Sequence, residues 1–364
     1  MTANYEWQEK VYELWEDNGF IGIVSSSTGS GKTRTGAIAL KRYMDSHPDD
    51  VPLVLTPSSK VGKSWESELK AQGISAVSVM TYQTAVNRMR RDADFHCDVM
   101  IADECHRLCT PVQGQVLNLN PKAILGLSAT PEGSVEILGP PFMEIPITEA
   151  NICPFTIHYV TFTPTATEKE RYNRATENMR KRALEVTGGR KDYLKPGADS
   201  VGWNSYDALS RKRREVCYLM SSRIGHVVDI ISRNPDRRTV VYFERTKQVS
   251  ELHDALLIRG MESATHTQEG STIERFEGKD VNILIACKSL REGWNDPAID
   301  RVIMGSINTR TIVNTQTIGR ALRLNPDDPN KHADIYLLMA EGTSDVNVTR
   351  NLDYPKQNIR SEHI

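Results

Sequence analysis

Short apolar runs rich in β-branched residues alternate with longer polar stretches along nearly the whole chain. Such alternation is typical of parallel sheets, whose consecutive strands are joined by helices. The candidate strands form two groups, at 22–24, 51–55, 76–80, 98–102 and 123–127, and at 239–243, 263–266, 281–286, 301–305 and 334–339. The sequence therefore predicts an α/β fold with two parallel-sheet lobes in tandem, over residues 1–150 and 151–364.

The segment between the two groups of strands has a different character. Residues 168–186 and 206–231 are each predicted to be helical, and a stretch containing Gly and Pro separates them. Residues 168–215 contain 13 Lys or Arg against 8 Asp or Glu, most densely at Arg211–Arg214. This basic run is either a solvated helix face or a contact to nucleic-acid phosphates, and the sequence leaves both interpretations open.

Composition sets broad limits on the class of protein. The 364 residues suffice for two to three domains, with 39% hydrophobic and 25% charged residues, as in ordinary globular proteins. No apolar run approaches the ~18 residues of a membrane span, and residues 1–10 do not resemble a signal peptide. We therefore expect a cytoplasmic protein without a membrane partner, in the host cytoplasm if it is phage-encoded. The net charge of −2 gives no global basic field for coating nucleic acid.

Six cysteines spread over the chain do not form a disulfide framework. One local cluster, Cys105-His106-x-x-Cys109, could be part of a zinc site. Structural zinc sites use four ligands, and no second ligand pair lies nearby. We therefore do not predict zinc here.

The segment Ser26–Thr33 follows a candidate strand and precedes an apolar helix. A strand, a glycine-rich turn and a helix N-terminus place backbone N–H groups and the positive end of a helix dipole around an anion. Lys32 supplies a cation for the same phosphate oxygens, and the Thr33 hydroxyl can bind Mg²⁺. Ser26 stands where the phosphate-loop motif usually has glycine. The predicted ATP contacts are Thr28, Gly29, Ser30, Gly31, Lys32 and Thr33.

The strand at 98–102 ends in Asp103-Glu104-Cys105-His106. Ligands bind at the carboxyl ends of strands in open α/β sheets. Asp103 is therefore predicted to hold Mg²⁺ through water, and Glu104 to orient or deprotonate the water that attacks the γ-phosphate. An acidic pair that caps a helix is the alternative.

These motifs resemble those of the superfamily 2 helicases and translocases, in particular the type III restriction motors and the UvsW-like phage group. The resemblance covers nearly the whole chain and implies two RecA-like lobes, with a helical insertion at 165–232 at the start of the second. It implies that Gln8 contacts adenine and that His106, in a DExH form of motif II, couples the ATP site to the other lobe. Ser128–Thr130 matches the motif that links hydrolysis to strand movement. The implied strand contacts of the first lobe are Thr56, Pro57, Ser58, Thr81 and Tyr82.

In the second lobe, the resemblance implies that Arg245 and Thr246 contact the strand. Cys287 occupies a position often held by Thr, and a thiol is a weak donor to phosphate. Gly293, Asn295 and Asp296 are similar to the motif V that faces ATP, but the last two are swapped relative to the restriction motors. The residue that faces ATP therefore stays open between them. Gln316-x-x-x-Arg320-x-x-Arg323 matches motif VI, whose arginines stabilise charge on the transferring phosphoryl group.

The resemblance favours DNA as the partner of an ATP-dependent, Mg²⁺-dependent motor that works as a monomer. Its function would be a DNA helicase or translocase activity, by unwinding or branch migration. An RNA-remodelling ATPase and an ATP-gated clamp without productive turnover are the alternatives. Tyr193, Trp203 and Tyr206 in the insertion either stack on bases or pack the insertion on its lobe.

Overall fold

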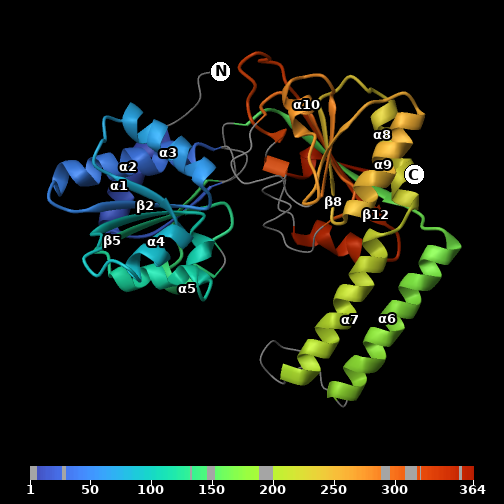
Figure 1. Cartoon of the computed structure of the whole chain (residues 1–364), viewed down its shortest axis with the longest axis horizontal. Helices are drawn as coiled ribbons and strands as arrows, with labels where there is room; N and C mark the ends of the chain where they lie inside the picture. The colour runs from blue at the N-terminus through green and yellow to red at the C-terminus, as the bar shows by residue number, and fades with distance from the viewer. Residues whose placement is uncertain are drawn as a thin grey trace. The chain divides into compact units, whose positions relative to one another are not determined.

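The structure is a computed structural model that describes residues 6–26, 30–131, 133–145, 152–187, 200–287, 296–307, 318–319, 321–351 and 355–364. The chain divides into two compact units (Figure 1). The first unit comprises Met1–Cys153 with Arg291–Pro297 and Thr315–Pro329, and the second comprises the rest of the chain. The sequence-based division at residue 150 places those two later segments in the second lobe.

The first unit is built on a six-stranded sheet in the order β3-β2-β4-β5-β1-β6. All its strand pairs are parallel, and β2, β4 and β5 are buried along their whole length. Burial on both faces explains why these strands are continuous apolar runs without alternation. The strands are β1 (Ile21–Ser26), β2 (Pro52–Thr56), β3 (Ser78–Thr81), β4 (Val99–Asp103), β5 (Ala123–Ser128) and β6 (Pro141–Ile145).

Helices cover this sheet and join its strands. Trp15 and Trp65 lie fully buried among the apolar side chains of α1, α2 and α3 on one side of the sheet, while Tyr82 and Leu108 belong to a second apolar cluster. The helices are α1 (Glu6–Asp17), α2 (Lys32–Ser46), α3 (Ser59–Ala71), α4 (Tyr82–Met89) and α5 (Val135–Leu138), with 3₁₀ helices η1 (Cys105–Cys109) and η2 (Gln113–Leu119).

The second unit contains a seven-stranded parallel sheet in the order β13-β7-β12-β11-β8-β10-β9. With the first sheet, it confirms the predicted fold class of two parallel-sheet lobes in tandem. The strands are β7 (Phe155–Phe162), β8 (Thr239–Phe243), β9 (Ala264–His266), β10 (Ile283–Cys287), β11 (Arg301–Met304), β12 (Ala333–Ala340) and β13 (Ile359–His363).

The helical insertion differs from the prediction in two respects. The expected helix at 206–231 is two helices, because the chain breaks around Met220 between α7 (Ser200–Tyr218) and α8 (Ser222–Ser232). The apolar face of α8 belongs to the core of the unit, so only α6 (Ala166–Thr187) and α7 form a projecting pair. These two helices lie side by side and extend away from the sheet of their unit (Figure 1). We call them the hairpin.

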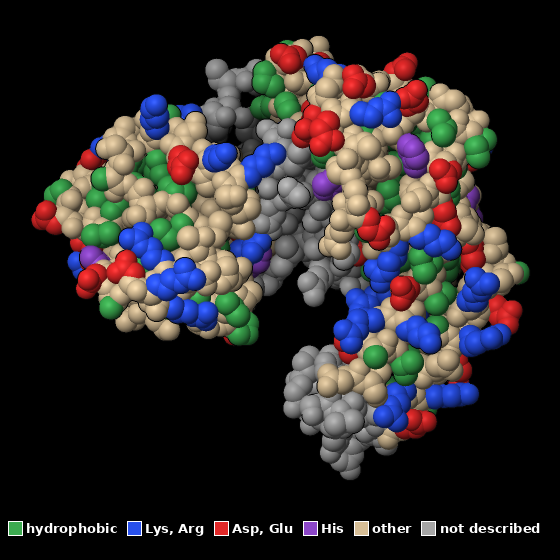
Figure 2. Space-filling view, viewed as in Figure 1, with side chains coloured by type: hydrophobic (Ala, Val, Ile, Leu, Met, Phe, Trp, Pro, Cys, Tyr) green, Lys and Arg blue, Asp and Glu red, His purple; other side chains and the backbone are tan. Residues whose placement is uncertain are grey.

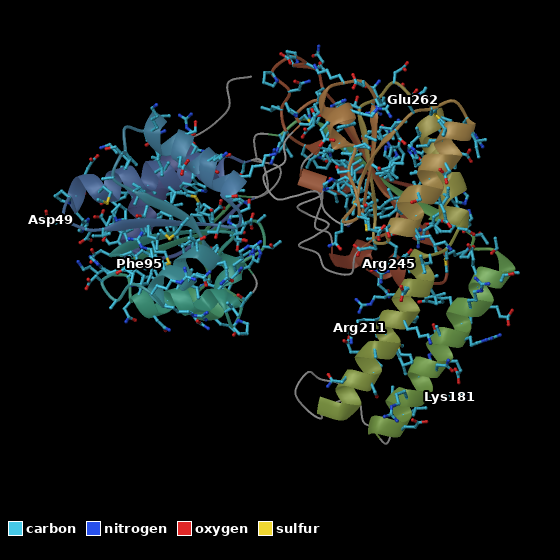
Figure 3. The ribbon with its side chains drawn as sticks, in the orientation of Figure 1. Asp49, Phe95, Lys181, Arg211, Arg245 and Glu262 are labelled. Carbon is cyan, nitrogen blue, oxygen red and sulfur yellow. The ribbon has the colours of Figure 1, made fainter. Side chains whose placement is uncertain are left out.

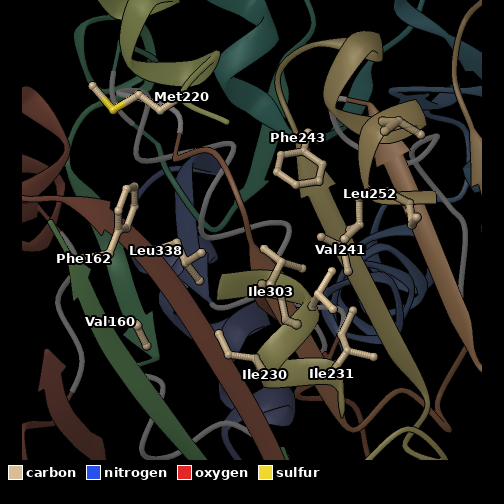
Figure 4. Close-up of a cluster of buried hydrophobic side chains, with 14 of the residues drawn as sticks. Val160, Phe162, Met220, Ile230, Ile231, Val241, Phe243, Leu252, Ile303 and Leu338 are labelled. Atoms are coloured by element: carbon tan, nitrogen blue, oxygen red, sulfur yellow. The ribbon is translucent and has the colours of Figure 1, made fainter. Parts of the chain in front are cut away.

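The core of the second unit lies between its sheet and the covering helices (Figure 4). Val241 and Phe243 of β8, Ile303 of β11 and Leu338 of β12 meet the buried face of α8 there. The remaining helices are α9 (Thr246–Ile258), α10 (Ile273–Glu277) and the 3₁₀ helices η4 (Ser344–Asn351) and η5 (Lys356–Asn358). Among the described residues, no helix combines the length and the apolar character needed to cross a membrane.

Candidate nucleotide site

The predicted phosphate loop links β1 to α2. Gly31 is the N-cap of α2 and has φ 94° and ψ 25°, a left-handed conformation that favours glycine. Lys32 therefore starts the helix, and its Nζ lies 3.4 Å from the Ser26 carbonyl oxygen. Thr33 follows in the first helical turn and is partly buried. The free N–H groups and the dipole of a helix N-terminus favour an anion at this position.

Ser26 takes the place of the usual first glycine without backbone strain. It is the last residue of β1 and therefore has extended backbone that any residue adopts. Its side chain is 2% exposed and accepts a hydrogen bond from Ser30 Oγ at 3.0 Å. The serine therefore connects the two sides of the loop.

Asp103 ends β4 and is held from two sides. Trp65 Nε1 donates to Asp103 Oδ2 at 2.8 Å, and Tyr82 Oη donates to the Asp103 carbonyl oxygen at 2.8 Å. Burial, together with the adjacent Glu104, raises the pKa of the Asp103 carboxyl to about 6. A cation bound beside this carboxylate would favour its ionised form. Sequence reasoning did not identify Trp65, because nothing in its local pattern distinguishes it from an ordinary core tryptophan.

Glu104 has a positive φ of 54°, which is unusual for a residue with a side chain. Such strain costs about 1–3 kcal/mol and occurs preferentially at functional sites. The turn brings Glu104 Oε1 within 3.6 Å of Lys32 Nζ. Glu104 Oε2 accepts a hydrogen bond from Ser128 Oγ at 3.4 Å. The carboxylate thus lies between the phosphate loop and the end of β5, and it retains 16% exposure.

Ser128 connects the end of β5 to the acidic pair. Its hydroxyl contacts His106 Nδ1 at 3.3 Å and accepts from the Thr130 backbone N–H at 3.1 Å. His106 Nδ1 also lies 3.5 Å from Glu104 Oε2. His106 and the Ser128–Thr130 segment, named separately from the sequence, therefore share one hydrogen-bonded cluster with Glu104.

The residues of the zinc alternative have other partners. Cys105 is fully buried, its Sγ lies 3.4 Å from Ser134 Oγ, and burial raises the pKa of its thiol to about 12. Zinc binds the thiolate, which this environment disfavours. Among the described residues, no three His, Cys, Asp or Glu side chains are arranged to hold a metal.

Gln8 of α1 reaches the phosphate loop. Its Nε2 lies 3.4 Å from the Gly31 carbonyl oxygen, and its side chain is 1% exposed. Its Oε1 is buried and has no hydrogen-bond partner among the described residues. Buried acceptors are normally satisfied, so this oxygen could accept a donor such as the exocyclic amine of adenine.

The donor set fits a magnesium nucleotide. A left-handed glycine, a helix N-terminus and Lys32 suit phosphate, while Thr33 and Asp103 offer the oxygen ligands that Mg²⁺ requires. Gln8 Oε1 adds an acceptor suited to the base. The predicted loop contacts Thr28 and Gly29 lie outside the described residues.

The predicted strand contacts of the first unit divide into exposed and buried groups. Ser58 and Thr81 are the N-caps of α3 and α4, where each hydroxyl accepts a backbone N–H, and both are partly exposed like Pro57. Thr56 and Tyr82 are 0% and 1% exposed. Their side chains cannot touch a strand in this structure, so the prediction of contacts by these two side chains is revised. Tyr82 supports Asp103 instead.

Three predicted strand contacts lie at or just after the carboxyl ends of β8 and β10. Arg245 precedes α9, and its Nε donates to Glu215 Oε1 of α7 at 3.1 Å. Thr246 begins α9, and Cys287 ends β10. Asp296 and Tyr206 are partly buried.

Arg323 belongs to the late segment that groups with the first unit. It is partly buried and follows Leu322, whose carbonyl accepts the Cys153 backbone N–H at 2.8 Å. Six other predicted positions lie outside the described residues: Tyr193, Gly293, Asn295, Gln316, Arg320 and the side chain of Trp203. The roles of all these residues stay predictions.

Two family descriptions match the chain. The type III restriction enzyme, res subunit family matches residues 68–133, and the helicase conserved C-terminal domain matches residues 222–325. The chain is 23% identical over 375 residues to Rad25 of Haloarcula marismortui, a protein named as a DNA 3'-5' helicase, covering 95% of this chain. It is 24% identical over 363 residues to the DNA 3'-5' helicase XPB of Mycobacterium tuberculosis, covering 88% of this chain. The chain spans only 54% and 59% of these two relatives.

Solved structures share the fold at low sequence identity. The ATP-dependent Type ISP restriction-modification enzyme LlaBIII bound to DNA aligns over 100% of this chain and 31% of its own, with a TM-score of 0.63 and 14% identity. The helicase domain of Pyrococcus furiosus Hef aligns over 95% of this chain and 97% of its own, with a TM-score of 0.56 and 14% identity. These likenesses show the fold, two tandem RecA-like lobes.

The fold defines the class of protein, one with two RecA-like α/β units in tandem. The two family matches follow the order of the motifs along the chain. The chain is therefore similar to superfamily 2 helicases and translocases of the type III restriction group.

Proposed function

We propose that this protein hydrolyses ATP to move along or remodel DNA. The observation that carries the proposal is the cluster in which Lys32 Nζ lies 3.6 Å from Glu104 Oε1, beside the buried Asp103 and a left-handed Gly31. This arrangement joins a phosphate cradle to a carboxylate suited to a metal and to a second carboxylate, Glu104, which could act on water once a phosphate draws Lys32 away. Phosphoryl transfer depends on this positioning and on stabilisation of charge.

Each residue of the first unit has a distinct role in this proposal. Gly31 and Lys32 bind the β- and γ-phosphates, and Thr33 and Asp103 hold the Mg²⁺ that neutralises charge on the phosphate oxygens. Glu104 orients the attacking water and accepts its proton. When phosphate occupies the loop, Lys32 turns from Glu104 to that anion, which frees the carboxylate for water.

Two late segments of the chain, Arg291–Pro297 and Thr315–Pro329, which group with the first unit, supply the remaining groups. Arg320 and Arg323 act on the transferring phosphoryl group with Gln316 beside them, and Gly293 with Asn295 or Asp296 faces the nucleotide. Because these groups are distant from Lys32 in the sequence, ATP hydrolysis would require both parts of the chain to act on the same nucleotide. His106, joined to Ser128 and Glu104, would report the state of the site to the strand-binding surface.

DNA is the proposed partner. The two relatives are named as DNA helicases, and one structural neighbour is titled as bound to DNA. Pro57, Ser58, Thr81, Arg245, Thr246 and Cys287 are the proposed strand contacts. An N-cap such as Ser58 or Thr81 presents backbone N–H groups that suit a phosphate. Movement with unwinding and movement with branch migration are both consistent with this set.

The decisive experiment compares ATPase rates with single-stranded DNA, duplex DNA, forked or four-way DNA, and RNA. The Glu104→Gln variant serves as the inactive control. We expect DNA to stimulate the wild-type rate more than RNA does, and the best DNA shape to indicate unwinding or branch migration. Greater stimulation by RNA would favour the RNA-remodelling alternative. Tight ATP-dependent DNA binding without turnover would favour the clamp.

A further inference from the structure

The hairpin is fixed to the second sheet through one buried arginine. Arg223, in the first turn of α8, is 0% exposed although it is charged. Buried charges are normally paired and fully hydrogen-bonded, and Arg223 pairs with the buried carboxylate of Asp345 in η4. Its guanidinium also lies 5.1 Å from the Phe162 ring of β7.

The other hydrogen bonds of Arg223 join separate elements. Its Nε donates to the Cys217 carbonyl oxygen at the end of α7, at 3.1 Å. One of its terminal nitrogens donates to the carbonyl oxygens of Gly305 after β11, at 2.9 Å, and of Leu338 in β12, at 3.0 Å. A planar guanidinium with five donors can hold several carbonyls at fixed angles, which a lysine cannot. Arg223 therefore locks the base of the hairpin to two neighbouring strands.

Gly305 is tightly held on its other sides as well. Its N–H donates to the Tyr242 carbonyl oxygen at 2.9 Å, and a Cβ at this position would lie 2.2 Å from the Phe243 ring. The next residue, Ser306, donates its hydroxyl to Gln248 of α9 at 3.0 Å. Residues 305 and 306 begin the segment that leads along the chain to Arg320 and Arg323. A shift of this junction would change where that segment starts.

The hairpin carries positive charges that could bind the phosphates of a nucleic-acid strand. Lys and Arg side chains gather over it (Figure 2), and Arg211 and Lys212 of α7 are exposed. Arg245, the N-cap of α9 and a proposed strand contact, is labelled in Figure 3 and pairs with Glu215 of α7. A strand that pulls on α7 would move Cys217 near the end of this helix. Arg223 binds the carbonyl oxygen of Cys217.

We propose that Arg223 is a positioning residue that couples strand engagement by the hairpin to Gly305, the residue after β11 from which the chain continues toward motif VI. This inference rests on the proposed function, since it requires a strand that stimulates ATP hydrolysis. The residue touches neither nucleotide nor strand. Arg223 transmits movement of the hairpin to the sheet, because α7, β11, β12 and η4 cannot move independently while its hydrogen bonds are intact.

The test compares two buried arginines of the second unit. The double variant Arg223→Met/Asp345→Leu removes both charges, so that neither is left buried without a partner. The control is Arg301→Met. Arg301 is 2% exposed, lies in β11 itself, and bonds Thr239, Ile230 and Asn234 away from the hairpin. Arg223→Lys keeps the charge opposite Asp345 but loses the fork, and carries the test if the double variant does not fold.

The readout is the ratio of DNA-stimulated to basal ATPase rate, with KM for ATP and thermal unfolding measured in parallel. We expect the Arg223 variants to lower the ratio about fivefold or more, with KM for ATP within about twofold of wild type, while Arg301→Met keeps the ratio. Combining Arg223→Lys with Arg211→Ala/Lys212→Ala should give less than the product of the separate losses, as coupled sites do.

Equal ratios for folded Arg223 variants and wild type would overturn the inference and leave the proposed function intact. An equal fall in Arg301→Met would do the same, because it would mark a general effect of damage to the sheet. A wild-type protein that no nucleic acid stimulates would overturn the proposed function and the inference with it.

Discussion

At the carboxyl edge of the first sheet, charged side chains point at one another across a partly open space, whereas at the carboxyl edge of the second sheet one buried arginine binds backbone carbonyls. Lys32 and Glu104 keep 10% and 16% exposure, and Glu104 has a strained backbone. Arg223 is fully buried. Both edges belong to parallel sheets with similar connections, so the topology does not explain the difference.

The two edges differ in how far their polar groups are satisfied. Gln8 Oε1 has no hydrogen-bond partner among the described residues, and Lys32 has long contacts of 3.4 and 3.6 Å. Arg223 instead makes bonds of 2.9 to 3.1 Å to three carbonyls and pairs with Asp345. Groups left loosely satisfied are available to a ligand, whereas a saturated network fixes the elements around it. The carboxyl edge of the first sheet is therefore suited to binding a ligand, and that of the second sheet to transmitting movement between elements.

The first edge would differ most from the second if the late segment Thr315–Pro329, which groups with the first unit, also contributed to chemistry. We expect Arg320→Ala to lower kcat by ~10³ or more with ATP binding largely retained, because arginine fingers act on charge in the transition state. Steady-state ATPase rates and nucleotide binding measured separately would check this. Arg310→Ala, just before this segment and outside the motif, is the control, and a loss below tenfold would contradict the role of a finger.

The division of work within the first edge predicts two different defects. Glu104→Gln should lower kcat by ~10²–10⁴, the usual contribution of a general base, and still bind ATP. Lys32→Ala should lose turnover and weaken ATP binding as well, because it removes a phosphate contact. Single-turnover hydrolysis and equilibrium nucleotide binding separate these effects. Glu136→Gln, an exposed carboxylate of the same unit, is the control, and wild-type rates for Glu104→Gln would remove its assignment as the base.

Local patterns sufficed for the two parallel sheets, because buried parallel strands are apolar runs. They also selected the residues at the strand ends as candidates for chemistry, and the roles of those residues stay predictions. Three strands escaped prediction. β6 starts with Pro141, which weakens a strand pattern, and β13 is a polar edge strand. β7 lies just before the polar sequence of the hairpin, so its apolar pattern does not stand out as a strand in the sequence.

The supports of the site could not be predicted from sequence. Trp65, on a helix distant in sequence, donates to Asp103, and Tyr82 supports the same residue from within the core. These contacts depend on how helices pack over the sheet, which no single segment encodes. The break at Met220 was missed for a similar reason, since both flanking helices have compatible polar and apolar patterns.

The role of Trp65 predicts a smaller effect on the metal. Trp65→Phe removes the donor to Asp103 Oδ2 and keeps an aromatic ring. Residues that orient a metal ligand typically change metal affinity 10–100-fold, so the Mg²⁺ concentration for half-maximal ATPase should rise about tenfold. Trp15→Phe is the matched control. Trp15 is equally buried in the same unit and donates its indole N–H to the Ile124 carbonyl at 3.1 Å, away from the site. Equal Mg²⁺ requirements for both variants would show that Trp65 only packs.

The smallest expected effect concerns the exposed cations of the hairpin. Arg211→Ala/Lys212→Ala removes two exposed cations of α7, so the logarithm of the DNA-binding constant should fall less steeply with the logarithm of salt concentration. Each lost phosphate contact changes that slope by about 0.7 for single strands and 0.9 for duplex. Lys169→Ala/Lys181→Ala removes two exposed cations from α6, and thus the same charge. Figure 3 labels Lys181 on this helix. If both pairs flatten the slope equally, the hairpin acts through its general charge. If only the α7 pair does so, the strand lies against α7, the helix whose end Arg223 holds. If neither double variant changes the slope, the basic run is a solvated helix face. The hairpin then does not bind the strand, and Arg223 has no strand-driven movement to transmit.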